Sequence, residues 1–348
     1  MSTAKETSEQ LALPGIPAPA QGIDSNTEAD WVWTEEGTDD DMESLAFSHT
    51  TVMRSEVTQA LSAQAADGAT FVDVTLGGGG HTEALLEAHP GVRVIALDRD
   101  EVALAAARAR LAAFEGRVTF VHAAFGTLRD ALANIGVTAV QGLCADLGVS
   151  SPQLDEASRG LSFRREGPLD MRMDQSQGET ALELIARIGD DELANIIYQY
   201  GEERRSRRIA RSIKRSLGDG ELTTTLDLRR AVVRAVGPVR VGGVDPATRT
   251  FQALRIAVNQ ELGELDSLLA QVDDVIAPGG VVALISFHSL EDRAIKHAFA
   301  GRDGWRPLSK KPLYPTEEEQ AANTRSRSAK LRVYARELVL MDEMEEEP

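Results

Sequence analysis

Several features of other protein classes are missing from this 348-residue chain. It has one cysteine, Cys144, so an internal disulfide framework is excluded. Cys144 lies in an apolar run with no accompanying base motif, which favours a small buried side chain over a nucleophile. No apolar run is long enough to cross a bilayer, and no signal-peptide pattern is present. We therefore expect a protein of the reducing cytoplasm with no membrane partner.

Basic residues are also outnumbered by acidic ones, which gives a formal net charge of −18. The acids are unevenly placed: residues 1–45 carry −10 and residues 340–348 carry −5, which leaves about −3 for the rest of the chain. Residues 1–45 are rich in Ala, Pro, Gly and Ser, so we expect a disordered acidic extension there and an acidic tail at 340–348. The overall charge therefore does not exclude a nucleic-acid partner for the remaining residues.

The most informative stretch is FVDVTLGGGGHT, residues 71–82. A β-branched run ends at Asp73, four glycines follow at 77–80, and helical periodicity resumes after them, which predicts a strand, a tight loop and a helix. Glycines let the backbone approach a ligand closely, and the N–H groups at the start of the helix face it. A second apolar strand ends at Asp98, where doubly wound folds place an acid that accepts ribose hydroxyls. Together the two patterns indicate a nucleotide site.

Two kinds of ligand compete for such a loop. A dinucleotide loop needs a third glycine, and this chain has Thr82 at that position. The common S-adenosylmethionine loop, an acid followed by spaced glycines, fits Asp73, Gly77 and Gly79, with Thr75 in place of its first glycine. An NAD(P)-dependent oxidoreductase and a non-catalytic RNA- or ribosome-binding protein are the competing hypotheses.

Strands and helices alternate on both sides of a helical segment, which predicts a doubly wound α/β sheet. We expect residues 46–155 and 246–339 to form this domain and residues 156–245 to be an inserted helical domain for RNA or substrate recognition. Ligands of open parallel sheets lie beyond the carboxyl ends of the strands. His81, Asp98, Phe125 and Asp146 should therefore converge on one crevice.

Capping patterns predict the helix starts in the second half of the chain. Thr180-x-x-Glu183 is a capping box, Thr225 is placed to cap the helix that follows it, and Asp292 is placed to complete the cap of the helix after the last buried strand. Residues 246–276 keep helical periodicity throughout, which predicts one long helix.

The inserted segment also carries a basic cluster. Its seven cations face two acids, Glu202 and Glu203, so neighbouring charges do not neutralise it. The cations are Arg204, Arg205, Arg207, Arg208, Arg211, Lys214 and Arg215. Because they are spread around a helix, we favour an electrostatic contact with phosphate over a solvated helix face.

Five separated blocks give the chain a close resemblance to a known family. They are HTTVM at His49, DVTLGGGGHT at Asp73, DLGVSSPQLDEASRGLSF with GPLDMRMD between 146 and 174, YGEERRSRRIAR at Tyr200, and ATRTFQALRIAVNQEL with ISFHSLEDR. Over residues 48–338 the chain resembles the bacterial 16S rRNA (cytosine-N4)-methyltransferases called RsmH or MraW. The resemblance implies a class I, Rossmann-like methyltransferase that uses S-adenosylmethionine. Its implied target is a cytidine in the decoding region (P site) of the small ribosomal subunit.

The resemblance also implies the residues that contact S-adenosylmethionine. They are Gly79, Gly80, His81, Asp98, Phe125, Asp146 and Gln153. On this assignment Asp98 takes the ribose hydroxyls, Phe125 covers the adenine, and backbone N–H groups of residues 79–81 meet the methionine moiety. The target base has to leave its stack to reach such a crevice, which suits a single-stranded or easily opened substrate. The oligomeric state is left open, a homodimer included.

The acceptor nitrogen sets a further requirement. The cytosine N4 is a poor nucleophile because its lone pair is delocalised into the ring, so an acceptor has to hold one N–H as it attacks. Many amino-methyltransferases use an N/D/S-P-P-Y/F turn after the fourth strand, which this chain lacks. Asp146 at that location is the first candidate for the catalytic residue, and His288 is the second, although a lone histidine there could equally be structural. No metal-ligand cluster appears, so we expect no metal.

Overall fold

The computed structural model describes residues 51–238 and 244–338. The predicted acidic extension at 1–45, the tail at 340–348 and His49 lie outside these ranges. Within the ranges, none of the helices is long and apolar enough to span a membrane.

The centre of the molecule is a seven-stranded sheet with the order β3-β2-β1-β4-β5-β7-β6. The strands are β1 (Thr70–Asp73), β2 (Arg93–Asp98), β3 (Val118–His122), β4 (Val140–Asp146), β5 (Ile276–Ser286), β6 (Trp305–Pro307) and β7 (Lys330–Arg336). Strands β1 to β5 run parallel, and β7 pairs antiparallel with both β5 and β6. This order confirms the predicted doubly wound α/β fold, with the strand order reversing between β1 and β4.

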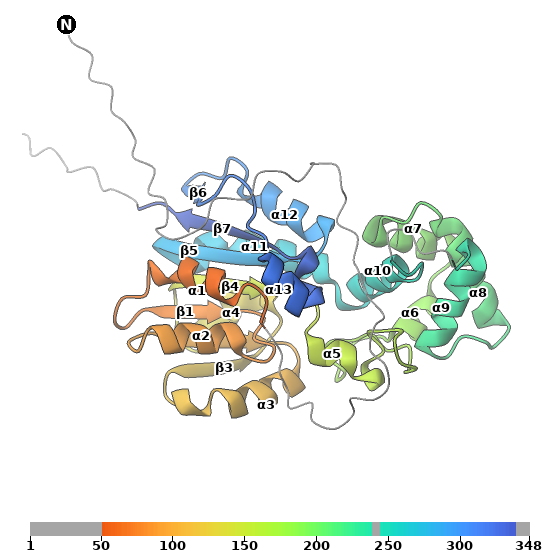
Figure 1. Cartoon of the computed structure of the whole chain (residues 1–348), viewed down its shortest axis with the longest axis horizontal. Helices are drawn as coiled ribbons and strands as arrows, with labels where there is room; N and C mark the ends of the chain where they lie inside the picture. The colour runs from red at the N-terminus through yellow and green to blue at the C-terminus, as the bar shows by residue number, and fades with distance from the viewer. Residues whose placement is uncertain (1–50, 239–243, 339–348) are drawn as a thin grey trace, which may run out of the picture.

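Helices cover both faces of the sheet (Figure 1). They are α1 (Arg54–Ser62), α2 (Gly80–Ala88), α3 (Glu101–Arg110), α4 (Leu128–Asn134), α11 (Glu261–Val275) and α12 (Ser289–Phe299). Successive residues of a strand face opposite sides. On β2, Val94 packs in the core formed with α1 and α2, whereas Ile95 and Leu97 pack in the core formed with α4, α11 and α12. Burial on both faces explains why these strands are almost continuous apolar runs in the sequence.

A helical lobe stands to one side of the sheet (Figure 1). Its helices are α6 (Ala181–Arg187), α7 (Asp190–Gly201), α8 (Ser206–Gly218), α9 (Thr225–Val236) and α10 (Thr248–Asn259). They share an apolar core that includes Ile185, Ile197, Ile213 and Leu254. Because Leu254 lies on α10, this core extends beyond residue 245. We propose that the lobe ends with α10.

The prediction of one long helix over residues 246–276 is wrong. Gln260 separates α10 from α11 and has a left-handed backbone conformation with φ 53°. Because of this break, the two helices pack in different cores. Phe251 on α10 packs in the lobe, and Leu265 on α11 packs against the sheet. Apolar spacing alone does not reveal such a break, because the helical period continues through it.

The capping patterns found the helix starts to within one residue. The capping box of Thr180 and Glu183 is confirmed, with Thr180 Oγ1 accepting from Glu183 N at 3.2 Å. The cap predicted at Thr225 is wrong, because Thr224 caps α9 with Asp227 as its partner. Thr225 lies one residue further on, where its hydroxyl group hydrogen-bonds the chain that leads into the lobe.

The cap predicted for α12 is also wrong. His288 is the N-cap residue, and its Nδ1 accepts from Glu291 N at 3.3 Å. Asp292 instead accepts from Arg332 Nε on β7 at 2.7 Å. A local sequence pattern does not reveal this choice, because the two residues are 40 positions apart.

A buried ion pair crosses the break between α10 and α11. Arg255 Nε and Nη2 donate to the two carboxylate oxygens of Glu261 at 2.8 and 2.9 Å. Both side chains are less than a tenth exposed. The pair therefore joins the lobe to the sheet-packed helix through an interaction that water does not screen.

We predict that Arg255→Met lowers the free energy of unfolding by about 3–5 kcal/mol, because it leaves the Glu261 carboxylate buried without a counter-ion. Urea unfolding followed by circular dichroism measures the change. Arg187→Met is a matched control, since Arg187 forms the same two hydrogen bonds with Glu179 at the surface. Surface pairs contribute about 0–1 kcal/mol, so equal losses in the two variants would contradict the prediction.

Candidate active site

One cavity lies at the carboxyl ends of the parallel strands. Asp98 ends β2, Asp146 ends β4, and both line this cavity. The other predicted contact residues in its lining are Gly80, His81, Phe125 and Gln153. The structure thus brings these residues together, whereas Gly79 is not part of the lining.

The glycine loop approaches the cavity through residues other than Gly79. Gly79 has φ +79°, its N–H donates to Leu76 O at 2.7 Å, and a Cβ there would lie 3.2 Å from Leu111 Cδ1. It therefore turns the chain against the helix after β2, and its N–H is already bonded within the loop. Gly77 and Gly78 line the cavity instead. The run of four glycines in the sequence did not indicate which of them would do so.

Asp98 couples the glycine loop to β2. Its Oδ2 accepts from Gly77 N at 2.8 Å, and its Oδ1 accepts from Asp100 N at 2.9 Å. Burial raises the pKa of this carboxyl to about 6. The group is therefore fixed in orientation and ionised at neutral pH, as an acceptor for ribose hydroxyls has to be.

Asp73 supports the loop without lining the cavity. The residue is 2% exposed. Its Oδ2 accepts from Thr82 Oγ1 at 2.8 Å, and its Oδ1 accepts from Thr75 N at 3.3 Å. Burial raises the pKa of the carboxyl. Asp73 thus ties the end of β1 to the start of α2 and holds the loop between them.

His81 and Asp146 carry unpaired polar atoms of the cavity. His81 is 6% exposed, and its Nε2 lies 3.8 Å from Asp146 Oδ2. Among the described residues, neither ring nitrogen of His81 has a hydrogen-bond partner, and Asp146 Oδ1 has none. Asp146 N donates to Thr75 Oγ1 at 2.6 Å, which fixes the end of β4. Buried polar atoms without partners are rare in folded proteins, so this corner indicates a ligand.

Gln153 is held in place by the protein. Its Oε1 accepts from Ser150 N at 3.0 Å, and its Nε2 donates to Asp100 Oδ2 at 2.8 Å. Asp100 also pairs with Arg159 Nη2 at 2.8 Å, in an ion pair that is almost fully buried. Arg159 was not predicted as a site residue, and its place within the DEASRGLSF block was the only sign of it in the sequence.

His288 is not part of the cavity lining. Besides capping α12, its Nε2 lies 3.1 Å from Glu291 Oε1, and together with Glu261 these residues form a buried group of potential metal ligands. Arg255 occupies both oxygens of Glu261, so an ion pair accounts for that member of the group. The neighbouring Phe287 lines the cavity in place of His288.

A C-terminal segment closes one side of the cavity. It is the 3-10 turn Thr324–Ser328, which follows α13 (Glu317–Ala322). In that turn Arg325 lines the cavity, and its Nη2 lies 2.6 Å from Asp155 Oδ1. On α13, Glu319 Oε1 accepts from Met53 N at 2.8 Å, and burial raises the pKa of Glu319.

The chemistry of the cavity fits S-adenosylmethionine. Asp98 offers an acceptor for hydroxyl groups, Phe125 offers an aromatic face, and Gly77 and Gly78 expose backbone at the lining. The unpaired oxygen of Asp146 is available to a positively charged or N–H-bearing group. These groups stand where a doubly wound fold binds a nucleoside.

Comparison with known proteins decides the family. Residues 46–337 match the sequence profile of the MraW methylase family. The chain belongs to the MraW methylase family. The Ribosomal RNA small subunit methyltransferase H of Sorangium cellulosum (strain So ce56) is 62% identical to it over 288 residues, which cover 83% of this chain and 90% of that protein.

Other comparisons extend this similarity. The protein of the same name from Synechococcus elongatus is 50% identical over 300 residues, 86% of this chain and 98% of its own length. An rRNA methylase from Streptococcus thermophilus aligns over 81% of this chain and 95% of its own with a TM-score of 0.37 and 11% identity, a likeness that adds nothing to the family assignment.

As an MraW-family methylase, the chain is a methyltransferase, and S-adenosylmethionine is its cofactor. The predicted enzyme class and cofactor are confirmed. The competing hypotheses of an NAD(P)-dependent oxidoreductase and of a non-catalytic binding protein are wrong.

We predict that Asp98→Ala weakens S-adenosylmethionine binding about 10- to 150-fold, because hydrogen bonds to a charged acceptor contribute about 1.5–3 kcal/mol. Affinity of the unmodified protein should fall as the pH drops through about 6, because protonation neutralises the carboxylate whose pKa burial has raised. Isothermal titration calorimetry between pH 5 and 8 measures both effects. Glu101→Ala, which removes an exposed acid on α3, is the control. Binding that is unchanged in Asp98→Ala would refute the ribose assignment.

Proposed function

We propose that this chain methylates the exocyclic N4 of a cytidine in 16S rRNA, in the decoding region (P site) of the small ribosomal subunit, and that it does so in the cytoplasm. Its relatives from Sorangium cellulosum and Synechococcus elongatus are named as ribosomal RNA small subunit methyltransferases. The observation that carries the proposal is that Asp98 and Asp146 line the same cavity. Asp98 is placed to bind the ribose of the cofactor. Asp146 is then available to bind the amine that attacks the methyl group.

Asp146 suits the role of holding the attacking amine. Its Oδ1 has no hydrogen-bond partner among the described residues, and its side chain is 22% exposed. An N–H held by this carboxylate orients N4 and increases the electron density on the nitrogen. The aromatic residue of the missing N/D/S-P-P-Y/F turn has a counterpart in Phe287, which lines the same cavity and can pack against the base.

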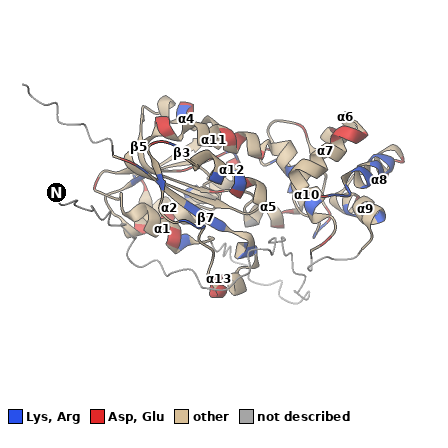
Figure 2. Ribbon diagram, turned by 90° about the horizontal axis from the view of Figure 1, so that it is seen from above, with Lys and Arg blue, Asp and Glu red and all other residues tan. Residues whose placement is uncertain are grey.

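Basic residues lie along α8 of the helical lobe, where they can contact the RNA backbone (Figure 2). On α8, Ile209 and Ile213 are buried, whereas Arg207, Arg208 and Arg215 are exposed. Within 51–238 and 244–338, no carboxylate forms an ion pair with these three arginines. The cations thus lie on the exposed side of the helix and do not surround it, in contrast to the sequence prediction. Such unneutralised arginines are typical of phosphate contacts.

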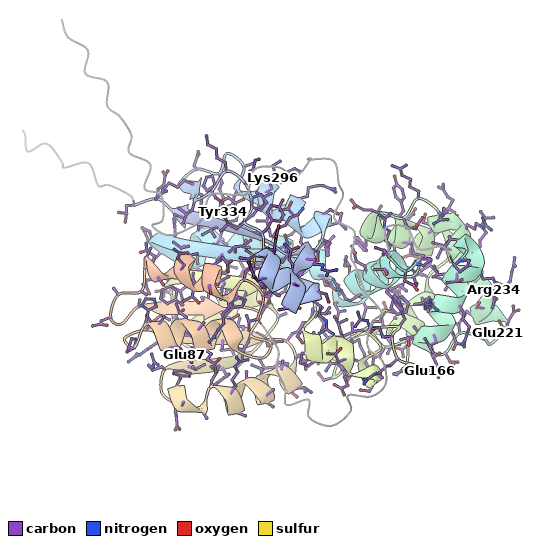
Figure 3. All side chains as sticks on the ribbon, viewed as in Figure 1. Glu87, Glu166, Glu221, Arg234, Lys296 and Tyr334 are labelled. Carbon is purple, nitrogen blue, oxygen red and sulfur yellow. The ribbon has the colours of Figure 1, made fainter. Side chains whose placement is uncertain are left out.

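Two members of the predicted basic cluster, Lys214 and Arg205, have partners outside α8. Lys214 Nζ donates to two backbone carbonyls at the end of α6. Arg205 lies 3.5 Å from Glu203 Oε1. The arginines of α9 are also paired, as Arg234 is with Glu221 at 3.3 Å at the outer end of the lobe (Figure 3). The exposed arginines of α8 are therefore the better candidates for RNA contacts.

The lobe is joined directly to the cavity. Asn259, at the end of α10, accepts from Met173 N with Oδ1 at 2.7 Å and donates to Met171 O with Nδ2 at 2.8 Å. Met173 lines the cavity. The lobe that carries the proposed RNA contacts is therefore hydrogen-bonded to the chain that lines the cavity.

The proposal is tested by transfer of labelled methyl groups to small subunits from a strain that lacks the enzyme, followed by nucleoside mass spectrometry. We expect N4-methylcytidine in 16S rRNA. Asp146→Ala should lower the rate by about 10² or more, because it removes the group that orients the amine. Asp130→Ala, an exposed acid on α4, should leave the rate unchanged. Methylation of another atom or another RNA would refute the proposal.

We predict that a triple variant, Arg207→Ala, Arg208→Ala and Arg215→Ala, binds small subunits more weakly and with a flatter salt dependence. The slope of log affinity against log salt should fall by about 2–3, because each phosphate contact contributes about 0.7–0.9. Filter binding at several salt concentrations gives the slope, and calorimetry should show unchanged cofactor affinity. A second triple variant that removes the exposed Arg93, Arg129 and Arg306 controls for net charge. Equal slopes in the two variants would reject the α8 surface.

A further inference from the structure

The imidazole of His81 has no assigned partner in the cavity. The cofactor contact predicted for His81 is made by its backbone N–H, so that contact leaves the side chain unused. The ring is nevertheless 6% exposed, faces Asp146 Oδ2 at 3.8 Å, and has no hydrogen bond on either nitrogen among the described residues. An imidazole can both accept and release a proton.

We propose that His81 Nε2 accepts the proton that the cytosine N4 loses during methyl transfer, while Asp146 holds the other N–H. This proposal rests on the N4-methyltransferase function proposed above. His81 would then be a catalytic residue and not only part of the cofactor-binding loop.

The proton balance of the reaction requires such an acceptor. S-adenosylmethionine supplies the methyl group, and the electron pair of the broken carbon–sulfur bond stays on sulfur. N4 starts with two hydrogens, forms a bond to the methyl carbon with its lone pair, and would be left with a positive charge. Release of one N–H proton to His81 Nε2 returns N4 to neutrality as N4-methylcytosine. The imidazolium then passes that proton to solvent, which restores the residue for another turnover.

The surroundings of the ring support this role. Three carboxyls from different elements face His81, namely Asp73 at the end of β1, Asp146 at the end of β4 and Glu319 on α13. Asp73 is bonded to the loop, and Glu319 Oε1 accepts from Met53 N. Asp146 is thus the carboxylate with an unpaired oxygen beside the ring. Its negative charge stabilises the positive charge that the imidazole gains.

A pair of variants separates proton transfer from simple contact. In His81→Gln the side chain keeps a polar end that can hydrogen-bond but cannot accept a proton, and in His81→Leu it has neither property. We expect both variants to lower the single-turnover rate of N4 methylation by about 10². We also expect the dependence of this rate on pH to become flatter in both variants. His297→Gln, which changes an exposed histidine on α12, is the control for histidine loss.

Binding provides a readout that does not depend on turnover. Calorimetry with S-adenosylhomocysteine should give the same dissociation constant for the unmodified protein and for His81→Gln, and the match would also show that the variant is folded. A wild-type rate and pH profile in His81→Gln would overturn the proton-acceptor role. A large loss of cofactor affinity in that variant would overturn it too and assign the ring to cofactor binding. If the unmodified protein makes no N4-methylcytidine, the proposed function itself fails.

Discussion

The buried ion pair between Arg159 and Asp100 fixes the cofactor side of the cavity relative to its lobe side. Both residues are 3% exposed, and Nη2 lies 2.8 Å from Oδ2. Asp100 follows β2, next to Asp98, and caps α3, whereas Arg159 belongs to the chain that leads into the lobe and also donates to Met173 O. A buried charge without its partner is strongly unfavourable. The cofactor side and the lobe side of the cavity are therefore constrained to one relative position.

The charges of the molecule are divided between its interior and its surface. Burial raises the pKa values of Asp73, Asp98 and Glu319, which shows that the fold places acids around the cavity at a cost in solvation. The exposed cations of α8 lie on the lobe, where they favour a polyanion. A net charge of −18 for the whole chain conceals both features.

Much of the fold and part of the site could be predicted from local patterns. The ends of β2 and β4 were predicted at Asp98 and Asp146, because each apolar run stops at an acid. The break at Gln260 could not be predicted, since a left-handed residue leaves the apolar period intact. Lys214 was placed among the free cations because its carbonyl partners at the end of α6 are far away in sequence.

The sequence by itself determined the strand–loop–helix unit, the doubly wound order and the convergence of Asp98 and Asp146. Each of these follows from short-range periodicity and from the rule that parallel strands end at one edge. Only the tertiary structure decided which glycines face the cavity, that Arg159 pairs with Asp100, and that no other described residue hydrogen-bonds the His81 ring. These features depend on contacts between segments far apart in the chain, and no local pattern encodes which distant polar group will satisfy a given atom.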